Sequence, residues 1–358
     1  MDAKIKLGIA AGIIALVAIT SYVALPGSSV PQDNGATPID QDRIGTKVLR
    51  LGYFPNVNHA QAVIGLGRGD FQNALGDVEV KTQIFNAGPS AIEALFANQI
   101  DATYIGPNPA INGYVRSEGD LRIVAGVASG GAVFVVRNDV GIQSTEDFAG
   151  KRFGSPQLGN TQDVALRAYL LNHGFKTVDN GGNVGVLPGK TADILTLLLK
   201  KEIDGAWVPE PWGAKFLKEA DTRIFLDERD LWPEGRFVTA HIIVNANYLE
   251  KNPGVIKKLL AAHIDETIWI NEHKEEALNV LNAEIARITG QTIPEDELKD
   301  AFSRLEITYD PVRESLIKSA DDAFELGFLG KERPNLSGIY DLTLLNEVLT
   351  DEGLATIP

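Results

Sequence analysis

The chain has 358 residues, of which 44% are hydrophobic, so it is long enough for about two domains with buried cores. It carries 48 acidic and 33 basic side chains, and the formal charge of -15 argues against a protein that binds nucleic acid. It contains no cysteine, which excludes disulfides, thiolate metal ligands, cysteine nucleophiles and a lipid attached through cysteine.

The first segment is apolar. Lys4 and Lys6 precede residues 7–26, LGIAAGIIALVAITSYVALP, which contain no charged side chain. About 20 apolar residues span a bilayer, whereas the apolar core of a cleaved signal peptide has about 7–15. We therefore interpret residues 1–26 as a membrane anchor in preference to a cleaved signal, with the bulk of the chain outside the cytoplasm by the positive-inside rule. Residues 27–45, rich in Gly, Pro, Ser, Asn and Asp, are predicted to be a flexible linker.

From Lys47 onward, short β-branched or aromatic runs alternate with longer helical patterns, which is typical of α/β units on a mainly parallel sheet. A first set has predicted strands at residues 48–54, 78–85, 100–105 and 121–128, with helices at 59–71, 90–99 and 108–117. A second set has predicted strands at residues 151–156, 183–188, 203–211 and 222–227, with helices at 161–174, 192–202 and 212–220. The sequence therefore predicts two α/β lobes.

The two sets share a pattern and are joined twice. FANQIDATYIGPNPA and LKKEIDGAWVPEPWGA both run from a helix end through Ile-Asp to an aromatic residue and Pro-x-Pro, so Asp101 and Asp204 are expected to begin equivalent strands. VFVVR and FVTAHIIVN are predicted to be strands that cross between the lobes, and a helical tail is predicted to follow. The expected divisions are residues 46–136 for the first part of lobe 1, 137–237 for lobe 2, and 238–358 for the return crossing and a helical part that packs on lobe 1.

Residues 154–161, GSPQLGNT, differ by one residue from a phosphate-binding P-loop, because asparagine stands where lysine should. Gly159, Asn160 and Thr161 would place donors at a helix N-terminus, where the helix dipole contributes about +0.5 charge. An ordinary helix cap explains Asn160 or Thr161 but not the pair of glycines. Since no lysine neutralises a terminal phosphate, we interpret this turn as a site for a small oxyanion and not for a nucleotide.

Further candidate residues follow other predicted strands, where ligands of open α/β sheets bind. They are Phe54, Asn56, Asn58, Asn108, Ser129, Gln157, Glu210 and Trp212. Simpler roles stay open: Asn58 as a helix cap, Asn108 as a rigid turn and Trp212 as core filling, and for Glu210 a helix cap is the preferred interpretation. The histidines lack metal-ligand spacing, and no serine elbow or base–nucleophile pair is evident, so we expect neither a metal site nor an enzyme.

Three runs together resemble the extracytoplasmic binding proteins of ABC importers for nitrate, sulfonates and taurine, especially the aliphatic-sulfonate group. They are FNAGPSAIEALFANQIDATYIGPNPAI, GSPQLGNTQDVALRAYL and IDGAWVPEPWGAKF. The resemblance covers about Val48 to the end. It implies a type II periplasmic-binding-protein fold, in which two α/β lobes are joined by two crossover strands, with a C-terminal helical tail. It also implies a monomer that uses no cofactor, performs no catalysis, and delivers its ligand to a membrane permease with a cytoplasmic ATPase.

The resemblance also assigns roles to site residues. It implies first-lobe contacts from Phe54, Asn56, Asn58 and Asn108, an anion cradle from Gln157, Gly159, Asn160 and Thr161, and a wall from Glu210 and Trp212. An aliphatic sulfonate is the first candidate ligand, and taurine, nitrate and bicarbonate stay open. The lipoprotein cysteine usual in the family is absent, and the apolar N-terminus takes its place. The alternatives are an enzyme of the thiamine-precursor type, whose cysteine-rich motif is absent here, and a ligand-sensing ectodomain.

Overall fold

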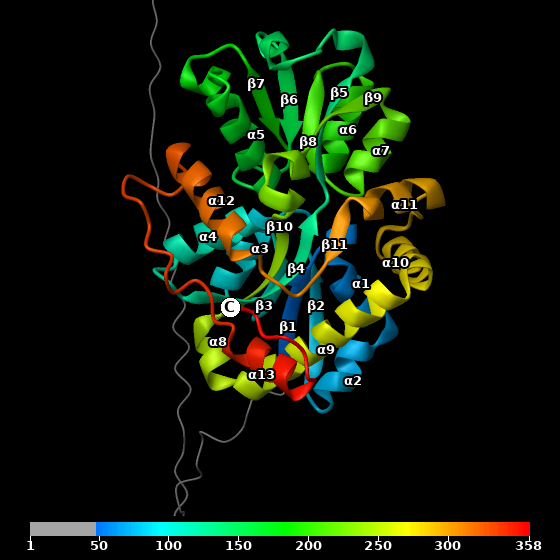
Figure 1. Cartoon of the computed structure of the whole chain (residues 1–358), viewed down its shortest axis with the longest axis vertical. Helices are drawn as coiled ribbons and strands as arrows, with labels where there is room; N and C mark the ends of the chain where they lie inside the picture. Colours follow the sequence, from blue (N-terminus) through cyan, green and yellow to red (C-terminus); the bar gives the residue numbers. More distant parts are fainter. Residues whose placement is uncertain (1–47) are drawn as a thin grey trace, which may run out of the picture. The chain divides into compact units, whose positions relative to one another are not determined.

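Two β-sheets organise the part of the chain that the computed structural model describes, residues Val48–Pro358 (Figure 1). The expected anchor at residues 1–26 and the linker at 27–45 lie outside the described residues. Among Val48–Pro358, no helix is long and apolar enough to cross a membrane.

The first sheet has six strands in the order β11-β4-β10-β3-β1-β2. β1 pairs in parallel with its two neighbours, whereas β10 runs antiparallel between β3 and β4. The strands are β1 (Val48–Tyr53), β2 (Glu79–Ile84), β3 (Ala102–Ile105), β4 (Leu121–Gly130), β10 (Val238–Asn245) and β11 (Leu305–Ile307). The helices between the first four strands are α1 (Ala60–Arg68), α2 (Asp70–Leu75), α3 (Gly88–Phe96) and α4 (Pro107–Arg116). The single helix predicted at residues 59–71 is divided, because Gly69 takes a left-handed φ of 81° between α1 and α2.

The second sheet has five strands in the order β7-β6-β8-β5-β9. Its strands are β5 (Ala132–Arg137), β6 (Arg152–Ser155), β7 (Gly185–Pro188), β8 (Gly205–Pro209) and β9 (Thr222–Asp227). Its helices are α5 (Thr161–Asn172), α6 (Thr191–Leu199) and α7 (Trp212–Glu219). We call the part built on the first sheet the first lobe and the part built on the second sheet the second lobe. In Figure 1 the second lobe is green and lies at the top.

The repeated Ile-Asp pattern has a structural counterpart in each sheet. The Asp101 carboxylate accepts a hydrogen bond of 2.8 Å from the backbone nitrogen of Arg50, and Asp204 accepts one of 2.8 Å from that of Arg152. Each aspartate thus precedes one central parallel strand and ties it to the start of a neighbouring strand. The two lobes therefore use the same local device at equivalent positions.

The chain crosses between the sheets twice. β4 and β5 form a nearly continuous extended segment that passes through Gly130 and Gly131, whose φ values of 76° and 75° favour glycine. The return from β9 to β10 runs through the short 3-10 helices η6 (Glu228–Leu231) and η7 (Pro233–Gly235). The crossing points therefore lie at the ends of the strands VFVVR and FVTAHIIVN, each of which pairs within one sheet.

The C-terminal part is helical, as the sequence predicts, with the short β11 inside it. Its helices are α8 (Ala246–Lys251), α9 (Pro253–Glu272), α10 (Lys274–Thr289), α11 (Glu295–Ser303), α12 (Arg313–Glu325) and α13 (Thr343–Asp351). α9 packs on α1, α2 and α13 of the first lobe. α11 and α12 also contact α7 and α5, so the helical part touches the second lobe as well as the first (Figure 1).

Candidate functional site

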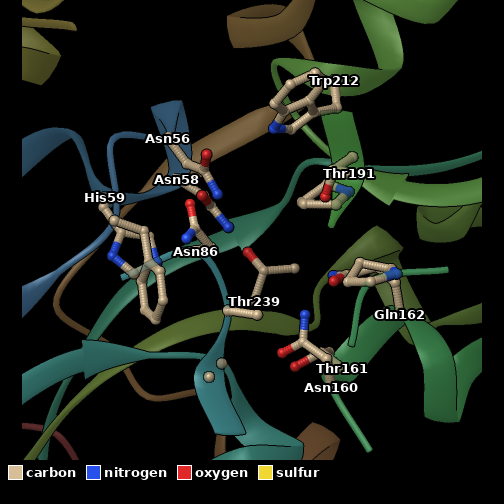
Figure 2. Close-up of a pocket in the computed structure, with 16 residues that line it drawn as sticks. Asn56, Asn58, His59, Asn86, Asn160, Thr161, Gln162, Thr191, Trp212 and Thr239 are labelled. Atoms are coloured by element: carbon tan, nitrogen blue, oxygen red, sulfur yellow. The ribbon is translucent and has the colours of Figure 1, made fainter. Parts of the chain in front are cut away.

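A small cavity of about 50 Å³ lies where the carboxyl ends of the strands in both sheets approach each other. We call it the head cavity. Figure 2 shows Asn56, Asn58, His59 and Asn86 on one side of it and Asn160, Thr161, Gln162, Thr191 and Trp212 on the other. The first group follows β1 and β2, and the second group follows β6, β7 and β8. Both lobes therefore contribute to the head cavity.

Five helices begin at the head cavity. Residues at the N-terminal ends of α3, α4, α5, α6 and α7 line it, namely Gly88, Gly106, Thr161, Thr191 and Trp212. None of the five N-cap residues accepts a side-chain hydrogen bond from its own helix. Each helix N-terminus carries about half a positive charge, so the cavity is suited to an anion, and of the five only α7 has, among residues 48–358, a carboxylate, that of Glu210, as a hydrogen-bond acceptor for one of its first N–H groups.

The lining carries no charged side chain. Its only titratable group is the imidazole of His59, and burial lowers the pKa of His59 to about 3, so the ring is neutral near pH 7. The positive potential thus comes from helix ends and not from basic residues. An oxyanion held in this way is bound by neutral N–H and O–H donors.

Three buried polar atoms at the head cavity have no hydrogen-bond partner among residues 48–358. They are the Oγ1 atom of Thr161, the Oδ1 atom of Asn58 and the Nδ1 atom of His59. Their residues are 6%, 4% and 3% exposed, respectively. A buried polar group without a partner costs about 1–3 kcal/mol, and protein interiors seldom keep one without a reason. The Thr161 hydroxyl can donate to a bound anion, whereas the Asn58 oxygen can only accept and suits an N–H or O–H group of a ligand.

The lobes come into close contact around the head cavity. A Cβ atom placed on Gly106 would lie 2.4 Å from the Oγ1 atom of Thr161, and one on Gly88 would lie 3.2 Å from the Oδ1 atom of Asn160. Nearby, the Ser90 hydroxyl donates to the Gln157 side chain across 3.2 Å. Glycine at position 106 therefore allows the start of α5 to reach the first lobe.

The structure brings together six of the eleven residues that the sequence singles out. The residues that line the head cavity are Phe54, Asn56, Asn58, Asn160, Thr161 and Trp212. The Asn160 side chain makes no capping hydrogen bond, so the ordinary cap does not account for it.

The other five predicted residues do not line the head cavity. The Asn108 amide donates to the backbone oxygen of Ser319 at 3.1 Å, and the Ser129 hydroxyl accepts from the backbone nitrogen of Phe237 at 3.2 Å. Gln157 contacts Ser90 instead. The role of Gly159 also differs from the prediction, because its N–H donates to the Asp163 carboxylate at 2.9 Å and so is not free for an anion.

Glu210 caps a helix and does not line the head cavity. Its Oε2 atom accepts a hydrogen bond from the backbone nitrogen of Ala214 at 3.0 Å, and its Oε1 atom lies 3.1 Å from the Nε atom of Arg304. Glu210 is 0% exposed and Arg304 5% exposed, and burial raises the pKa of Glu210 to about 7. This ion pair joins α7 of the second lobe to the segment that leads into β11 of the first sheet.

A larger cavity of about 630 Å³ adjoins the head cavity, and we call it the outer chamber. The two share Phe54, Asn56, Asn86, Thr191 and Trp212. The rest of its wall comes from α7, from the end of α10 and from the loop that leads into α11 (Figure 1). The sequence does not indicate this wall, because it comes from a helical segment far along the chain.

Several lining residues of the head cavity were missed by the sequence analysis. Asn86 and Thr191 follow predicted strands, so the rule that selected Asn56 could have selected them as well. Thr239 lies within β10, and nothing in the local sequence separates it from the other residues of that strand. Among Val48–Pro358, no group of three or more His, Cys, Asp or Glu side chains is placed to hold a metal ion.

Comparisons with known proteins agree on the family and the fold. The profile of the NMT1-like family matches residues 42–286. A protein of Brucella abortus, named as a candidate binding protein, is 25% identical over 231 residues, which cover 62% of this chain and 69% of that protein. A Bacillus subtilis protein, named as a candidate aliphatic sulfonates-binding protein, is 22% identical over 354 residues, which cover 95% of this chain and 97% of that protein.

The fold is also found among solved structures. The alkanesulfonate-binding protein of Xanthomonas axonopodis pv. citri, determined with MOPS bound, superposes with a TM-score of 0.67 and 16% identity. The superposition covers 80% of this chain and 96% of that one. At this identity the likeness shows the fold, and it confirms the predicted α/β class of periplasmic-binding-protein type.

Proposed function

The chain belongs to the NMT1-like family, and from this premise we propose that it is the substrate-binding component of an ABC importer. It captures a small organic anion, with a sulfonate as the first candidate, in the head cavity between its lobes. It then delivers the anion to a membrane permease that a cytoplasmic ATPase drives. In this proposal the protein works outside the cytoplasm as a monomer, with residues 1–26 as its membrane anchor.

One observation carries the proposal: five helix N-termini meet in a cavity with buried polar atoms that lack partners and with no charged side chain. Such a cavity offers several N–H and O–H donors at fixed positions. A sulfonate presents three oxygens that share one negative charge, so neutral donors from both lobes can bind it together. The names of the Bacillus and Xanthomonas relatives, which refer to aliphatic sulfonates and alkanesulfonates, support this choice of ligand.

Ligand binding also gives a reason for the two-lobe arrangement. The Thr161 hydroxyl comes from the second lobe and the side-chain NH2 group of Asn58 comes from the first, so one anion can accept from both only when the lobes are close. The contact of Gly106 with Thr161 shows how close they are in this structure. An anion bound there would stabilise the closed arrangement by the free energy of the contacts that it makes with both lobes.

The proposal is tested by calorimetry and thermal unfolding of the full-length chain. The ligands are methanesulfonate, taurine, nitrate and bicarbonate, with sodium chloride at matched ionic strength as the control. A ligand at about 100 times its Kd should stabilise the protein by about 2.7 kcal/mol, and we expect this from a sulfonate. If neither these anions nor any larger organic sulfonate binds more tightly than chloride, the proposed function is wrong.

A further inference from the structure

The two cavities together indicate the size of the ligand. This inference rests on the proposed function, because it concerns the remainder of the molecule whose anionic group occupies the head cavity. The head cavity, at about 50 Å³, has less than a tenth of the volume of the outer chamber, at about 630 Å³, so the bulk of a larger ligand cannot lie in it. The rest of a larger ligand must extend into the outer chamber, which shares five lining residues with the head cavity.

The outer chamber is wide, and aromatic side chains form part of its wall. Its volume of about 630 Å³ is within the roughly 300–1,000 Å³ of pockets for drug-sized ligands. Phe54, Phe85 and the partly exposed Trp212 line it, and the first two rings have centroids 6.3 Å apart. A tail of four carbons is far smaller than the drug-sized ligands that pockets of this volume hold. A short alkyl tail would therefore leave most of the chamber unfilled and the partly exposed Trp212 in contact with water.

The wall opposite α7 is held in place by hydrogen bonds and an ion pair. The Asn282 amide donates to the backbone oxygen of Ile293 at 2.7 Å and accepts from its nitrogen at 2.8 Å. The Thr289 hydroxyl donates to the backbone oxygen of Ile285 at 2.8 Å. Lys218 of α7 and Asp296 of α11 form an ion pair of 2.5 Å. These contacts hold the chamber wall in one conformation, which lowers the entropy cost of association.

The charged groups of the outer chamber balance each other. Lys190, Lys215, Glu219 and Glu297 line it, and the Nζ atom of Lys215 lies 3.6 Å from a Glu219 oxygen. The chamber thus offers no excess charge to a second charged group on the ligand. We propose that the ligand is an organic monoanion whose uncharged tail carries at least one ring, with the ring against Trp212, Phe54 and Phe85.

Calorimetry with three sulfonates on the full-length chain tests the inference. The probes are methanesulfonate, butanesulfonate and 2-naphthalenesulfonate, which share the anionic group and differ in the tail. We expect 2-naphthalenesulfonate to bind at least tenfold more tightly than either alkyl probe. Equal or weaker binding of 2-naphthalenesulfonate overturns the ring-bearing tail but leaves the proposed function intact. If none of the three binds, both the proposed function and the inference are wrong.

A bulky substitution in the outer chamber distinguishes binding of the ligand's tail from binding of its anionic group. Ala192 is exposed, lines the outer chamber and does not line the head cavity. We expect Ala192→Trp to weaken 2-naphthalenesulfonate binding at least tenfold and to change methanesulfonate binding less than twofold. Ala97→Trp, at an exposed alanine that lines neither cavity, is the matched control and should change neither affinity. Equal weakening of both probes by Ala192→Trp would show that the tail does not occupy the chamber.

Discussion

Replacement of Thr161 by valine should separate ligand binding from folding. Valine keeps the branched shape of threonine and removes the hydroxyl, whose oxygen has no hydrogen-bond partner in the part of the chain that the structure describes. Thr161 is 6% exposed, so this oxygen is shielded from water. Because the folded protein loses no hydrogen bond, the free energy of unfolding should stay the same or rise by up to about 1 kcal/mol.

Binding should change in the opposite direction. A hydrogen bond to a charged group contributes about 1.5–3 kcal/mol, and the proposed anion accepts one from this hydroxyl. Since 1.4 kcal/mol corresponds to a factor of ten in Kd, Thr161→Val should weaken methanesulfonate binding roughly 10- to 150-fold. Calorimetry measures the Kd, and urea unfolding without ligand measures the stability.

The control is Thr350→Val, because Thr350 is an exposed threonine on α13 that does not line the head cavity. It should leave the Kd of methanesulfonate unchanged. Unchanged affinity of Thr161→Val for every anion that binds the native chain would refute the role of this hydroxyl. A loss of stability as large as the loss of binding free energy would show that the hydroxyl serves the fold instead.

Three other substitutions or conditions have measurable outcomes. Gly106→Ala should weaken methanesulfonate binding in calorimetry at least tenfold, because the new Cβ atom would lie 2.4 Å from the Thr161 hydroxyl of the second lobe. Gly254→Ala is the control and should leave binding unchanged, because its Cβ atom would have no neighbouring atom within 4 Å. Glu210→Ala should lower the urea-unfolding free energy by about 1.5–3 kcal/mol, because it removes the carboxylate that accepts from Ala214 and leaves the buried Arg304 with Asp300 as its remaining carboxylate, whereas Lys218→Ala in an exposed pair should cost at most about 1 kcal/mol. Burial lowers the pKa of His59 to about 3 in the folded state. As the pH falls below about 6.5, the unfolded state therefore binds more protons than the folded state, and the free energy of unfolding decreases. The wild type should then lose up to about 1.4 kcal/mol of stability per pH unit more than His59→Asn, and equal acid sensitivity of the two proteins would contradict this.

The sequence predicts the order of the secondary-structure elements in both sheets, because hydrophobic periodicity is a local property. The strands and helices around Asn56, Asn108 and Asn160 all form as predicted. The three-residue β11 was missed, since a strand that short has no distinct pattern. The division of the helix at Gly69 was also missed. A glycine within a helical sequence pattern can take either sign of φ, and the sequence does not show which one it takes.

The candidate site could be predicted in part. The rule that ligands lie beyond strand ends selected Asn58, Thr161 and Trp212, and these residues line the head cavity. The same rule selected Gly159 and Glu210, which are engaged by Asp163 and by Arg304. Local sequence cannot show this difference, because it depends on which partner reaches each polar group in the folded chain.

The sequence by itself determined that two α/β lobes form and that polar turns follow their strands, because both follow from short-range patterns of residues. The tertiary structure decided which polar atoms stay free, because hydrogen bonds within the protein remove some groups, such as the Gly159 N–H, from those available to a ligand. It also decided the size of the space beside them, because the loop between α10 and α11 forms a wall of the outer chamber. That wall depends on long-range packing of the C-terminal helices, which no short stretch of the sequence specifies.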